Sequence, residues 1–415
     1  MLLKIAIRNI MRHKRRTIFS SVTIAVGMLV FILMNSMMAG MDQGMIKNML
    51  HLSTGAIRIT TKLYEENMQT YSLQYGLEKA DEIEFELLKD KRVSGVTQRT
   101  QFLGQLSNNS EAVPVAGTVI NELKDSSVFD ISKYIDGAYF SNQNDHEIIL
   151  GSGLARDLGA KAGDYITLYS LTKYDSRNAD EFLVAGILKS TDPTINKNGV
   201  FITYTAAEEF LDLDGLVTEI DIAVKDRMSF AAFMQDVKDV QNGLQTIHPD
   251  LSVKSFMEIG AAFFKISKSK EAFGIVFMII ILLIAGVGIF NTVFMSVYER
   301  IREIGVLRAH GMTPGEINVL FILEGIITGI CGSILGITCG VIVNILLILK
   351  GLPMEKIMGN IDMGDIPLQG TIYGVWNFYA LVFVLTFGVL VSTVASILPA
   401  RVASKMQVTR ALKFN

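Results

Sequence analysis

The chain has 415 residues, of which 50% are hydrophobic and only 19% are charged. Its mean hydropathy of +0.38 excludes an ordinary soluble protein, and its net charge of -3 says little because segments in different compartments are averaged in one figure. The hydrophobic residues are concentrated in four stretches without charges, at residues 17–41, 272–298, 325–349 and 366–400. Because a transmembrane helix needs about 20 apolar residues, the sequence predicts four membrane-spanning helices.

The N-terminal segment, residues 1–16, precedes the first predicted membrane helix at residues 17–41. It carries basic side chains but no acidic one, which places it in the cytoplasm by the positive-inside rule. Its apolar residues have roughly helical spacing, so it is either an amphipathic helix on the membrane surface or the basic flank of the first helix. The apolar run that follows exceeds the core of a signal peptide, which is about 7–15 residues long. We therefore expect a retained membrane helix.

The long segment at residues 42–270 is predicted to lie outside the cytoplasm as an α+β domain. It contains no cysteine, so its stability depends on its own core. Residues 42–110 and 226–270 are predicted to form a membrane-proximal part, with helices at residues 77–90 and 228–243. A β-rich part at residues 111–225 is inserted in it. The elements predicted in this inserted part are strands at 147–150, 164–169, 181–188, 201–204 and 219–224, helices at 154–159 and 205–211, and a polar loop at 171–180.

The C-terminal half contains the other three predicted membrane helices, at residues 271–298, 317–349 and 366–400. A charged segment at residues 299–316 follows the first of these, and a short exterior loop at residues 350–365 precedes the last. The tail at residues 401–415 has basic but no acidic side chains. With an even number of crossings, both termini of this multi-pass protein are predicted to be cytoplasmic.

The third predicted helix carries two unusual features. Glycines recur along it every three or four positions, which lets another helix approach closely in lipid; the glycines expected at this packing face are Gly325, Gly329, Gly332 and Gly336. Glu324 is a carboxylate near one end of the apolar run, and we expect it to pair with a basic side chain of residues 299–316 rather than to relay protons. Cys331 and Cys339 are about 12 Å apart along the helix, too far for a disulfide.

The sequence lacks the short motifs that mark common enzyme classes. It has no G-x-x-x-x-G-K-[ST] loop, so any ATP that drives this chain must be hydrolysed by another one. Its histidines lack zinc-ligand spacing, and no G-x-S-x-G element is present. We therefore expect a chain that is not an enzyme and that binds no metal and no cofactor of its own.

Residues 299–312 alternate charged and apolar side chains and predict a short helix between two membrane helices. On such a helix, positions 300, 304, 307, 308 and 311 share a face that mixes arginine with apolar residues. This face favours docking into a groove of a soluble partner, whereas a helix that rests on lipid is the competing interpretation. The residues expected to couple the chain to such a partner are Glu299, Arg300, Glu303, Ile304, Arg308, Gly311 and Met312.

The same segment carries a longer motif, Glu299-Arg300, Glu303-Ile304-Gly305, Arg308-Ala309 and Gly311. It resembles the cytoplasmic loop of the FtsX/MacB family of ABC-transporter permeases. Further similarity lies at Arg8-Asn9, Arg15-Arg16-Thr17, Glu324-Gly325, Leu398-Pro399-Ala400-Arg401 and Ala411-Leu412, while Val408 stands where the family usually has proline. The resemblance implies two permeases, identical or homologous, bound to a dimer of ABC ATPase subunits that hold ATP and Mg. Residues 299–312 would then couple motion of the ATPase to the exterior domain.

Within this family, the chain is most similar to the lipoprotein-releasing (LolC/LolE) permeases in its length, its two-part exterior domain and the absence of a fused ATPase. Such permeases extract lipoproteins from the bacterial inner membrane for a periplasmic carrier. The loop at residues 171–180 lies in a place comparable to the hairpin that recruits the carrier, although it lacks proline. The partners implied are membrane lipids and such a carrier, with no nucleic acid. Alternatives are a MacB-like exporter of antibiotics or peptides and an FtsX-like regulator of a cell-wall hydrolase.

Substrate access in such permeases is expected between the first two membrane helices. Flexible methionines there suit varied acyl chains. The residues expected to line this path are Met34, Met37, Met38, Phe273, Phe277 and Ile281. Ordinary helix packing explains any one of them equally well.

Overall fold

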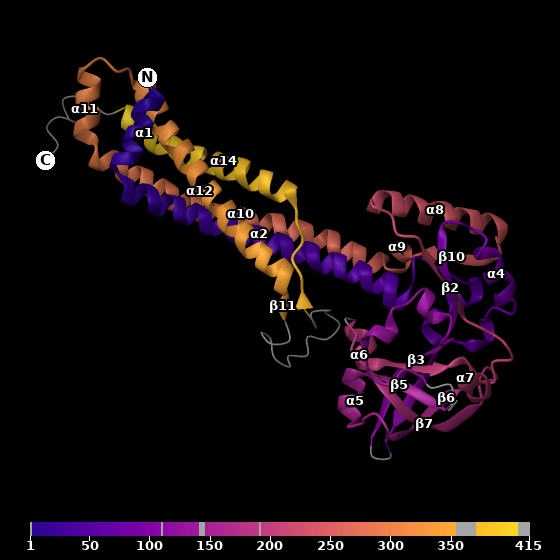
Figure 1. Ribbon diagram of the computed structural model, residues 1–415. Helices are drawn as coiled ribbons and strands as arrows, with labels where there is room; N and C mark the ends of the chain where they lie inside the picture. Colours follow the sequence, from indigo (N-terminus) through magenta and orange to yellow (C-terminus); the bar gives the residue numbers. More distant parts are fainter. Residues whose placement is uncertain (1, 109–110, 141–145, 191, 354–370, 406–415) are drawn as a thin grey trace. The chain divides into compact units, whose positions relative to one another are not determined.

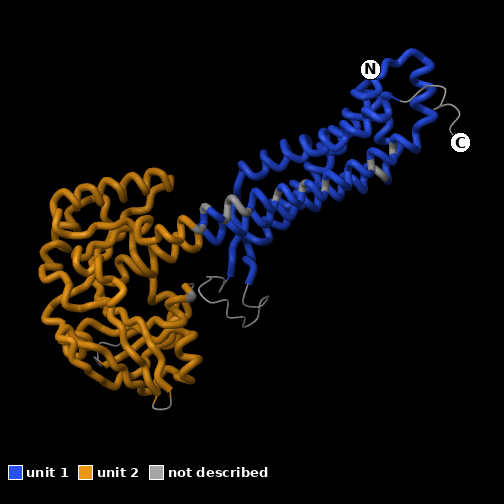
Figure 2. Tube along the Cα trace, turned by 180° about the vertical axis from the view of Figure 1, so that it is seen from behind, with its two compact units in different colours: residues 1–42, 266–353, 371–415 blue, residues 43–265, 354–370 orange. Residues whose placement is uncertain are grey.

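The computed structural model describes residues 2–108, 111–140, 146–190, 192–353 and 371–405. They divide into two compact units, coloured separately in Figure 2. The membrane unit comprises the described residues of 1–42, 266–353 and 371–415, and the sheet unit comprises those of 43–265. The chain passes between the units inside two continuous helices, α2 (Lys14–Asn48) and α10 (Ala261–Glu299).

The membrane unit is built from helices (Figure 1). Besides α2 and α10, it contains α1 (Leu2–Arg12), α11 (Ile301–Ala309), α12 (Pro314–Lys350) and α14 (Phe378–Ser404). Among the described residues, four helices are long and apolar enough to cross a membrane: Thr17–Ser53, Gly274–Glu299, Pro314–Lys350 and Phe378–Ser404. The four predicted membrane helices are thus confirmed.

Two helix ends differ from the prediction. The first membrane helix continues beyond residue 41 to Asn48, and a π-helical turn, Met49–Ser53, extends it further. The last one begins at Phe378 rather than at residue 366, because Asn377 Oδ1 accepts a hydrogen bond from the Ala380 amide and caps the helix. Before this cap, the short strand β12 (Thr371–Ile372) pairs with β11 (Leu352–Pro353). Residues 354–370, including most of the predicted loop, lie outside the described part.

Helix α12 uses its glycines to approach two neighbours. Gly325 and Gly329 lie against Ser392 and Ser396 of α14. The glycines that face α2 are Gly332, against Ile24, Gly336, against Met28, and Gly340, against Ile32. The predicted packing stripe therefore serves two helix pairs rather than one: its first part, at Gly325 and Gly329, meets α14, and its later part meets α2.

Gly336→Ala is expected to destabilise the membrane unit by about 1–3 kcal/mol, the usual cost of overpacking. A Cβ at this position would lie 2.7 Å from Met28 Cβ and 3.0 Å from the Ala25 carbonyl oxygen, so α2 would have to shift. The measurement is the temperature at which the detergent-solubilised chain leaves its size-exclusion peak. Gly286→Ala in α10 is the matched control, since its Cβ would meet Val391 at an ordinary 3.4 Å. Equal melting temperatures for the two variants would contradict the prediction.

The sheet unit is organised around one extended β-sheet (Figure 1). Its strands are β1 (Ile57–Thr61), β2 (Val93–Ser107), β3 (Ala112–Ile120), β4 (Ile135–Gly137), β5 (Glu147–Gly151), β6 (Tyr165–Leu171), β7 (Arg177–Leu188), β8 (Gly199–Thr203), β9 (Glu219–Val224) and β10 (Leu251–Ser255). Its helices are α3 (Lys62–Glu66), α4 (Ala80–Leu87), α5 (Ser152–Leu158), α6 (Pro193–Asn198), α7 (Tyr204–Leu211), α8 (Phe230–Ile247) and α9 (Phe256–Ile259).

The long strand β2 joins the two parts of this sheet. Its first half pairs with β9, which continues through β1 to β10. Its second half pairs with both β3 and β6, and the order β2-β3-β8-β5-β7-β6 closes into a ring. Each part has its own apolar core. Helices α4 and α8 cover the first, whereas α5 and α7 contribute to the second.

Most predicted strands and helices of this region are present, but two assignments were wrong. The strand at residues 219–224 was placed in the β-rich part, yet β9 pairs with β1 and its Ile220 and Ile222 pack in the core beside α8. The pattern of alternation identifies a strand but not its partner. The predicted loop at 171–180 is shorter, because β6 extends to Leu171 and β7 begins at Arg177.

The turn between β6 and β7 is also anchored rather than free. Asp214 accepts hydrogen bonds from Lys173 Nζ at 3.0 Å and from Tyr174 Oη at 2.7 Å. Gln74 Nε2 donates to Asp175 at 2.7 Å. The turn is therefore held against neighbouring loops, unlike a protruding hairpin.

Candidate functional site

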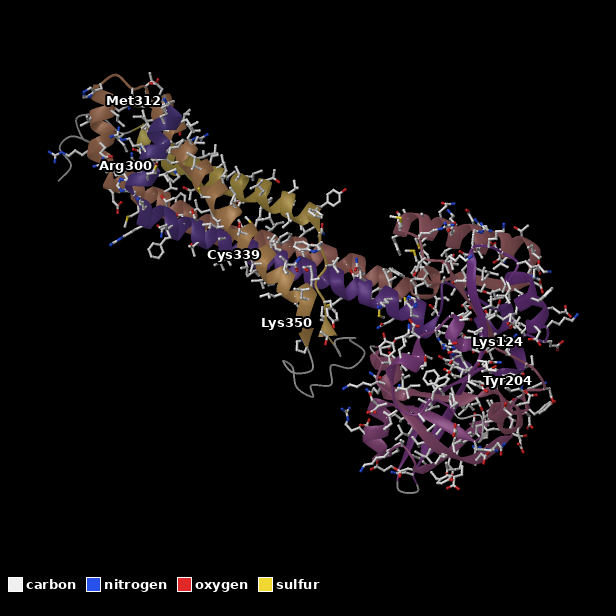
Figure 3. All side chains as sticks on the ribbon, viewed as in Figure 1. Lys124, Tyr204, Arg300, Met312, Cys339 and Lys350 are labelled. Carbon is white, nitrogen blue, oxygen red and sulfur yellow. The ribbon has the colours of Figure 1, made fainter. Side chains whose placement is uncertain are left out.

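The charged segment between the second and third membrane helices forms the short helix α11. Figure 3 labels Arg300 and Met312 near its two ends. Glu303 lies in its first turn and Arg308 in its last, which suits the helix dipole. Gly311 adopts a positive φ of 95°, a conformation that glycine tolerates best. Thr313 then begins α12 through a capping box with Glu316.

A buried ion pair joins this segment to α12. Arg300 Nη1 lies 3.0 Å from Glu324 Oε1 and 3.2 Å from Oε2, and the two side chains are only 5% and 6% exposed. Asn9 Nδ2 of α1 donates a further hydrogen bond to Glu324 Oε1 at 2.8 Å. The structure thus gives Glu324 the expected partner in the charged segment, and adds one from the N-terminal helix.

A second carboxylate extends this network towards solvent. Glu303 lies 3.0 Å from Arg300 Nε and 3.3 Å from Arg12 Nη1. Arg300 also lies beside the Phe321 ring, 5.6 Å from its centroid. We name the set Asn9, Arg12, Arg300, Glu303 and Glu324 the coupling junction. It ties α1, the start of α11 and α12 together, and so favours their movement as one body.

The N-terminal segment is accordingly more than a basic flank. Helix α1 packs against α12, and its Ala6 is fully buried. The sequence contained Arg8-Asn9 as part of a motif, but nothing in it indicated that Asn9 would meet a side chain 315 positions away. Asn9 and Arg12 are therefore functional candidates that the sequence did not identify.

One face of the charged segment was predicted to dock into a partner. At Arg300 and Ile304 this prediction was wrong, because both side chains are buried against the rest of the chain. These residues are 4% and 2% exposed, and Ile304 packs with Val297, Ile317, Phe321 and Ala400. Arg308 Nη1 donates to the Ser404 carbonyl oxygen at 2.9 Å. A helical period reveals an apolar stripe but not what covers it. The residues of this segment exposed to solvent are Glu299, Arg302, Val306, Ala309, His310 and Gly311, while Met312 is half-buried.

The residues predicted for substrate access are only partly brought together. Met34, Met37 and Met38 are half-buried on α2. Ile281 of α10 lies against Gly27, whereas Phe277 is 51% exposed. The side chain of Phe273 lies outside the described part. A small cavity is lined by Gly27, Met28, Phe31, Ile281, Phe383, Val384 and Phe387. It draws on α14, which the sequence prediction did not include.

A second polar cluster fastens the opposite end of the helix bundle. Ser36 Oγ of α2 donates to Asn344 Oδ1 of α12 at 2.5 Å and accepts from the Val375 amide at 2.9 Å. Asn377 Nδ2 donates to Asn35 Oδ1 at 3.0 Å. Polar contacts therefore hold both ends of the bundle, and between them Ser392 Oγ of α14 donates to the Gly325 carbonyl oxygen of α12 at 2.6 Å.

The described residues offer no group of three or more His, Cys, Asp or Glu side chains that could hold a metal ion. Cys331 and Cys339 are exposed on α12 and are not bonded to each other. The chemistry visible at the coupling junction is electrostatic pairing. This suits the transmission of movement.

Four membrane helices, a large α+β unit between the first and second, and a charged helix between the second and third define a multi-pass membrane permease. The MacB-like periplasmic core domain model matches residues 17–240, more than half of the chain, and the FtsX-like permease C-terminal model matches residues 275–408. The chain belongs to this FtsX/MacB family of ABC transporter permeases.

Several relatives align over most of the chain. An uncharacterised ABC transporter permease of Methanocaldococcus jannaschii is 22% identical, over 98% of this chain and 96% of that protein. The lipoprotein-releasing system transmembrane protein LolE of Haemophilus influenzae is 23% identical, over 95% and 93%. The macrolide export ATP-binding/permease protein MacB of Campylobacter jejuni is 26% identical, over 82% of this chain but 53% of that protein.

Solved structures of isolated domains match about half of the chain. The periplasmic region of MacB from Actinobacillus actinomycetemcomitans is 12% identical, covers 52% of this chain and 94% of its own, and has a TM-score of 0.35. The extracellular domain of the transporter YknZ from Gram-positive bacteria is 14% identical, covers 48% and 100%, and has a TM-score of 0.33.

Proposed function

We propose that this permease converts the motion of a separate ATPase dimer into a conformational change on the far side of the bacterial inner membrane. The observation that carries the proposal is the buried Arg300–Glu324 pair, which fastens the charged segment to a membrane helix. A force applied to α11 is passed on through this pair instead of being lost in a flexible loop. Both termini then lie in the cytoplasm with α11, and ATP and Mg are held by the partner ATPase.

The exposed side of α11 is the surface proposed to meet the ATPase. It presents Arg302 and Val306, and Glu299 at the end of α10 adds a negative charge, so the surface mixes both charges with an apolar side chain. Such a mixture suits a groove with a polar rim. The other residues predicted for coupling contribute indirectly, because their contacts with the rest of the chain hold α11 in place. These residues are Arg300, Glu303, Ile304 and Arg308.

The substrate we propose is a lipoprotein that is extracted from the membrane for sorting to the outer membrane. Support comes from the alignment with the lipoprotein-releasing protein LolE, which covers nearly the whole of both chains. The alignment spans 93% of that protein, whereas it spans only 53% of the ATP-binding/permease protein MacB. A second permease, identical or homologous, completes the complex, and a periplasmic carrier takes up the cargo.

A MacB-like exporter of antibiotics or peptides is the second candidate. The matching periplasmic core domain and the 26% identity to a macrolide export protein favour it. The anchored β6–β7 turn also weakens the case for a carrier-recruiting hook at residues 171–180. An FtsX-like regulator of a cell-wall hydrolase is the third, and the large sheet unit exceeds what that role needs.

The test combines affinity purification with depletion of the chain in its own cells. We expect an ABC ATPase to co-purify with the tagged chain, and lipid-modified proteins to accumulate in the inner membrane on depletion. Depletion of an unrelated four-span membrane protein is the control for general envelope damage. Normal lipoprotein sorting together with raised antibiotic sensitivity would replace lipoprotein release by export. Failure of any ATPase to co-purify would remove the coupling role itself.

A further inference from the structure

The end of α2 that lies in the sheet unit is not an ordinary helix end. After Asn48, the π-helical turn Met49–Ser53 leads the chain to β1, and the Thr54 amide bonds to the Met49 carbonyl oxygen at 2.8 Å to close it. A π-turn is wider and less stable than an α-helical turn and is frequent at functional sites. Left unsupported, it would absorb a displacement of α2 by changing its own shape.

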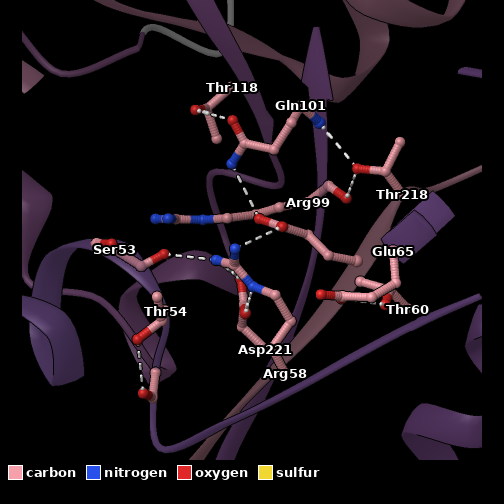
Figure 4. A network of polar contacts seen from close by, with 12 residues as sticks. Ser53, Thr54, Arg58, Thr60, Glu65, Arg99, Gln101, Thr118, Thr218 and Asp221 are labelled. Carbon is pink, nitrogen blue, oxygen red and sulfur yellow. Dashed lines mark hydrogen bonds and ion pairs between the residues drawn. The ribbon is translucent and has the colours of Figure 1, made fainter. Parts of the chain in front are cut away.

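One arginine holds this turn to the middle of the sheet (Figure 4). Arg58 of β1 donates from Nη2 to the Ser53 carbonyl oxygen at 2.6 Å, and from Nε to Asp221 Oδ1 of β9 at 2.8 Å. Its Nη1 lies 2.9 Å from Glu219 Oε2 of the same strand. The three side chains are at most 8% exposed. A single guanidinium thus connects the last carbonyl of the π-turn with two buried carboxylates of the central strand.

The strand register explains this arrangement. Arg58 is directly opposite Asp221 in the antiparallel pairing of β1 with β9, so both side chains project from the same face of the sheet. Glu219 is two positions away along β9 and shares that face. Gln101 Nε2 donates to Glu219 Oε1 at 2.9 Å and fixes the carboxylate from β2. The network therefore spans all three central strands.

The charges of this network reinforce the contact. Burial alone would lower the pKa of Arg58, but Asp221 and Glu219 outweigh it and raise that pKa above its ordinary value. Burial raises the pKa of Asp221, and the neighbouring Arg58 charge opposes that shift. The guanidinium consequently keeps its charge and its fixed fork of donors.

Backbone hydrogen bonds secure the same segment from other sides. The Asp130 amide bonds to the His51 carbonyl oxygen at 2.8 Å, and the Ala56 amide to that of Ile222 at 2.8 Å. The Phe256 amide, at the start of α9, bonds to the Ala56 carbonyl oxygen at 3.1 Å. The Asp130 bond also reaches the π-turn, at His51, whereas the Arg58 side chain joins the Ser53 carbonyl oxygen of the turn to Asp221 of β9.

We propose that Arg58 is a positioning residue that clamps the π-turn of α2 to strand β9, so that a displacement of α2 reaches the central strands of the sheet unit. The proposal rests on the proposed function, in which α2 carries the motion. A buried ion pair adds little stability compared with apolar residues of the same shape. The Arg58–Asp221 pair differs from a purely structural pair because the same guanidinium also bonds to the Ser53 carbonyl oxygen of the π-turn.

The test compares Arg58→Lys with Arg99→Lys by hydrogen exchange of the full-length chain, purified in lipid nanodiscs with its co-purifying ATPase. Both lysines keep the buried positive charge. Only Arg58→Lys loses the fork that reaches Ser53, since the Arg99 guanidinium pairs with Asp125 instead, at 2.8 Å and 2.9 Å. We expect the Thr54 amide to exchange about tenfold to a hundredfold faster in Arg58→Lys alone, because a bond to a charged group is lost.

The second readout is the change in exchange of β1 and β9 when MgATP and vanadate trap the ATPase. We expect the wild type and Arg99→Lys to show this change and Arg58→Lys to lose most of it. Equal behaviour of the two lysine variants, or a full response in Arg58→Lys, would overturn the clamp. A wild type that shows no nucleotide-dependent change would contradict the proposed function, whereas the clamp would still be judged from Thr54 exchange without nucleotide.

Thr54→Val provides an independent variant in case Arg58→Lys fails to fold. It removes one hydroxyl, which donates to the carbonyl oxygens of Met49 and Gly55 at 3.1 Å each, and leaves the ion pairs intact. Faster exchange in residues 49–56 together with a weaker nucleotide response in β9 would support the clamp. Faster exchange with an unchanged response would overturn it.

Discussion

Glu324→Ala should abolish ATP-driven transport and lower the stability of the membrane unit by about 3–5 kcal/mol, the typical cost of leaving a buried charge without its partner. The Arg300 guanidinium would lose both Glu324 oxygens, at 3.0 Å and 3.2 Å, and keep only the half-exposed Glu303, while Asn9 would lose its acceptor. Glu324→Gln should cost less, since the amide oxygen still accepts. The measurements are the melting temperature of the detergent-solubilised chain and transport per ATP hydrolysed by the purified complex.

Glu303→Gln is the matched control for this experiment. It also removes a carboxylate from Arg300, but Glu303 is 41% exposed, and such pairs contribute only about 0.2–1 kcal/mol. The double variant Arg300→Met/Glu324→Leu separates stability from coupling, because removing both partners restores an apolar contact without an orphaned charge. We expect it to recover the melting temperature but not transport. Recovery of both would mean that the pair is structural only.

The second large effect is expected in the sheet unit. Asp125→Ala should lower its stability by about 3–5 kcal/mol, because it leaves the Arg99 guanidinium buried without a carboxylate. The two side chains are each 2% exposed, and the guanidinium lies 3.4 Å from the centroid of the Phe129 ring. For a domain of this size the loss corresponds to a melting temperature lower by about 6–20 °C.

Proteolysis of the full-length chain at increasing temperature measures this change, with fragments of residues 43–265 as the readout. Asp236→Ala is the control: its ion pair with Arg227, at 2.6 Å, has a half-exposed guanidinium. We expect that variant to differ from wild type by about 0.2–1 kcal/mol. A loss as large for Asp236→Ala as for Asp125→Ala would show that burial does not set the cost at these sites.

Much of the fold could be predicted because it depends on local properties of the sequence. An apolar run of about 20 residues has few stable structures other than a membrane helix, and the four predicted spans are present. Alternation of side chains predicted β9 at its observed limits, Glu219–Val224. The motif in residues 299–311 indicated the family, because it resembles the cytoplasmic loop of those permeases.

The candidate site could be predicted only in part. The sequence indicated that Glu324 would pair with the charged segment, since an isolated carboxylate in lipid is costly. The sequence could not show which of the neighbouring arginines pairs with Glu324, nor that Asn9 donates a hydrogen bond to the same carboxylate. The same limit applies to α11, where the helical period placed Arg300 and Ile304 on one face but left open whether that face meets a partner or the ends of α12 and α14.

The sequence by itself determined the number of membrane helices, most strands of the α+β unit and the family. The tertiary structure alone decided which face of α11 is exposed, that β6 closes a ring with β2, and that Arg58 reaches the end of α2. The reason is that a helix or a strand can be recognised from the spacing of apolar side chains within a few neighbouring residues. Contacts between residues far apart in the sequence, such as Asn9 with Glu324, depend on how the whole chain folds.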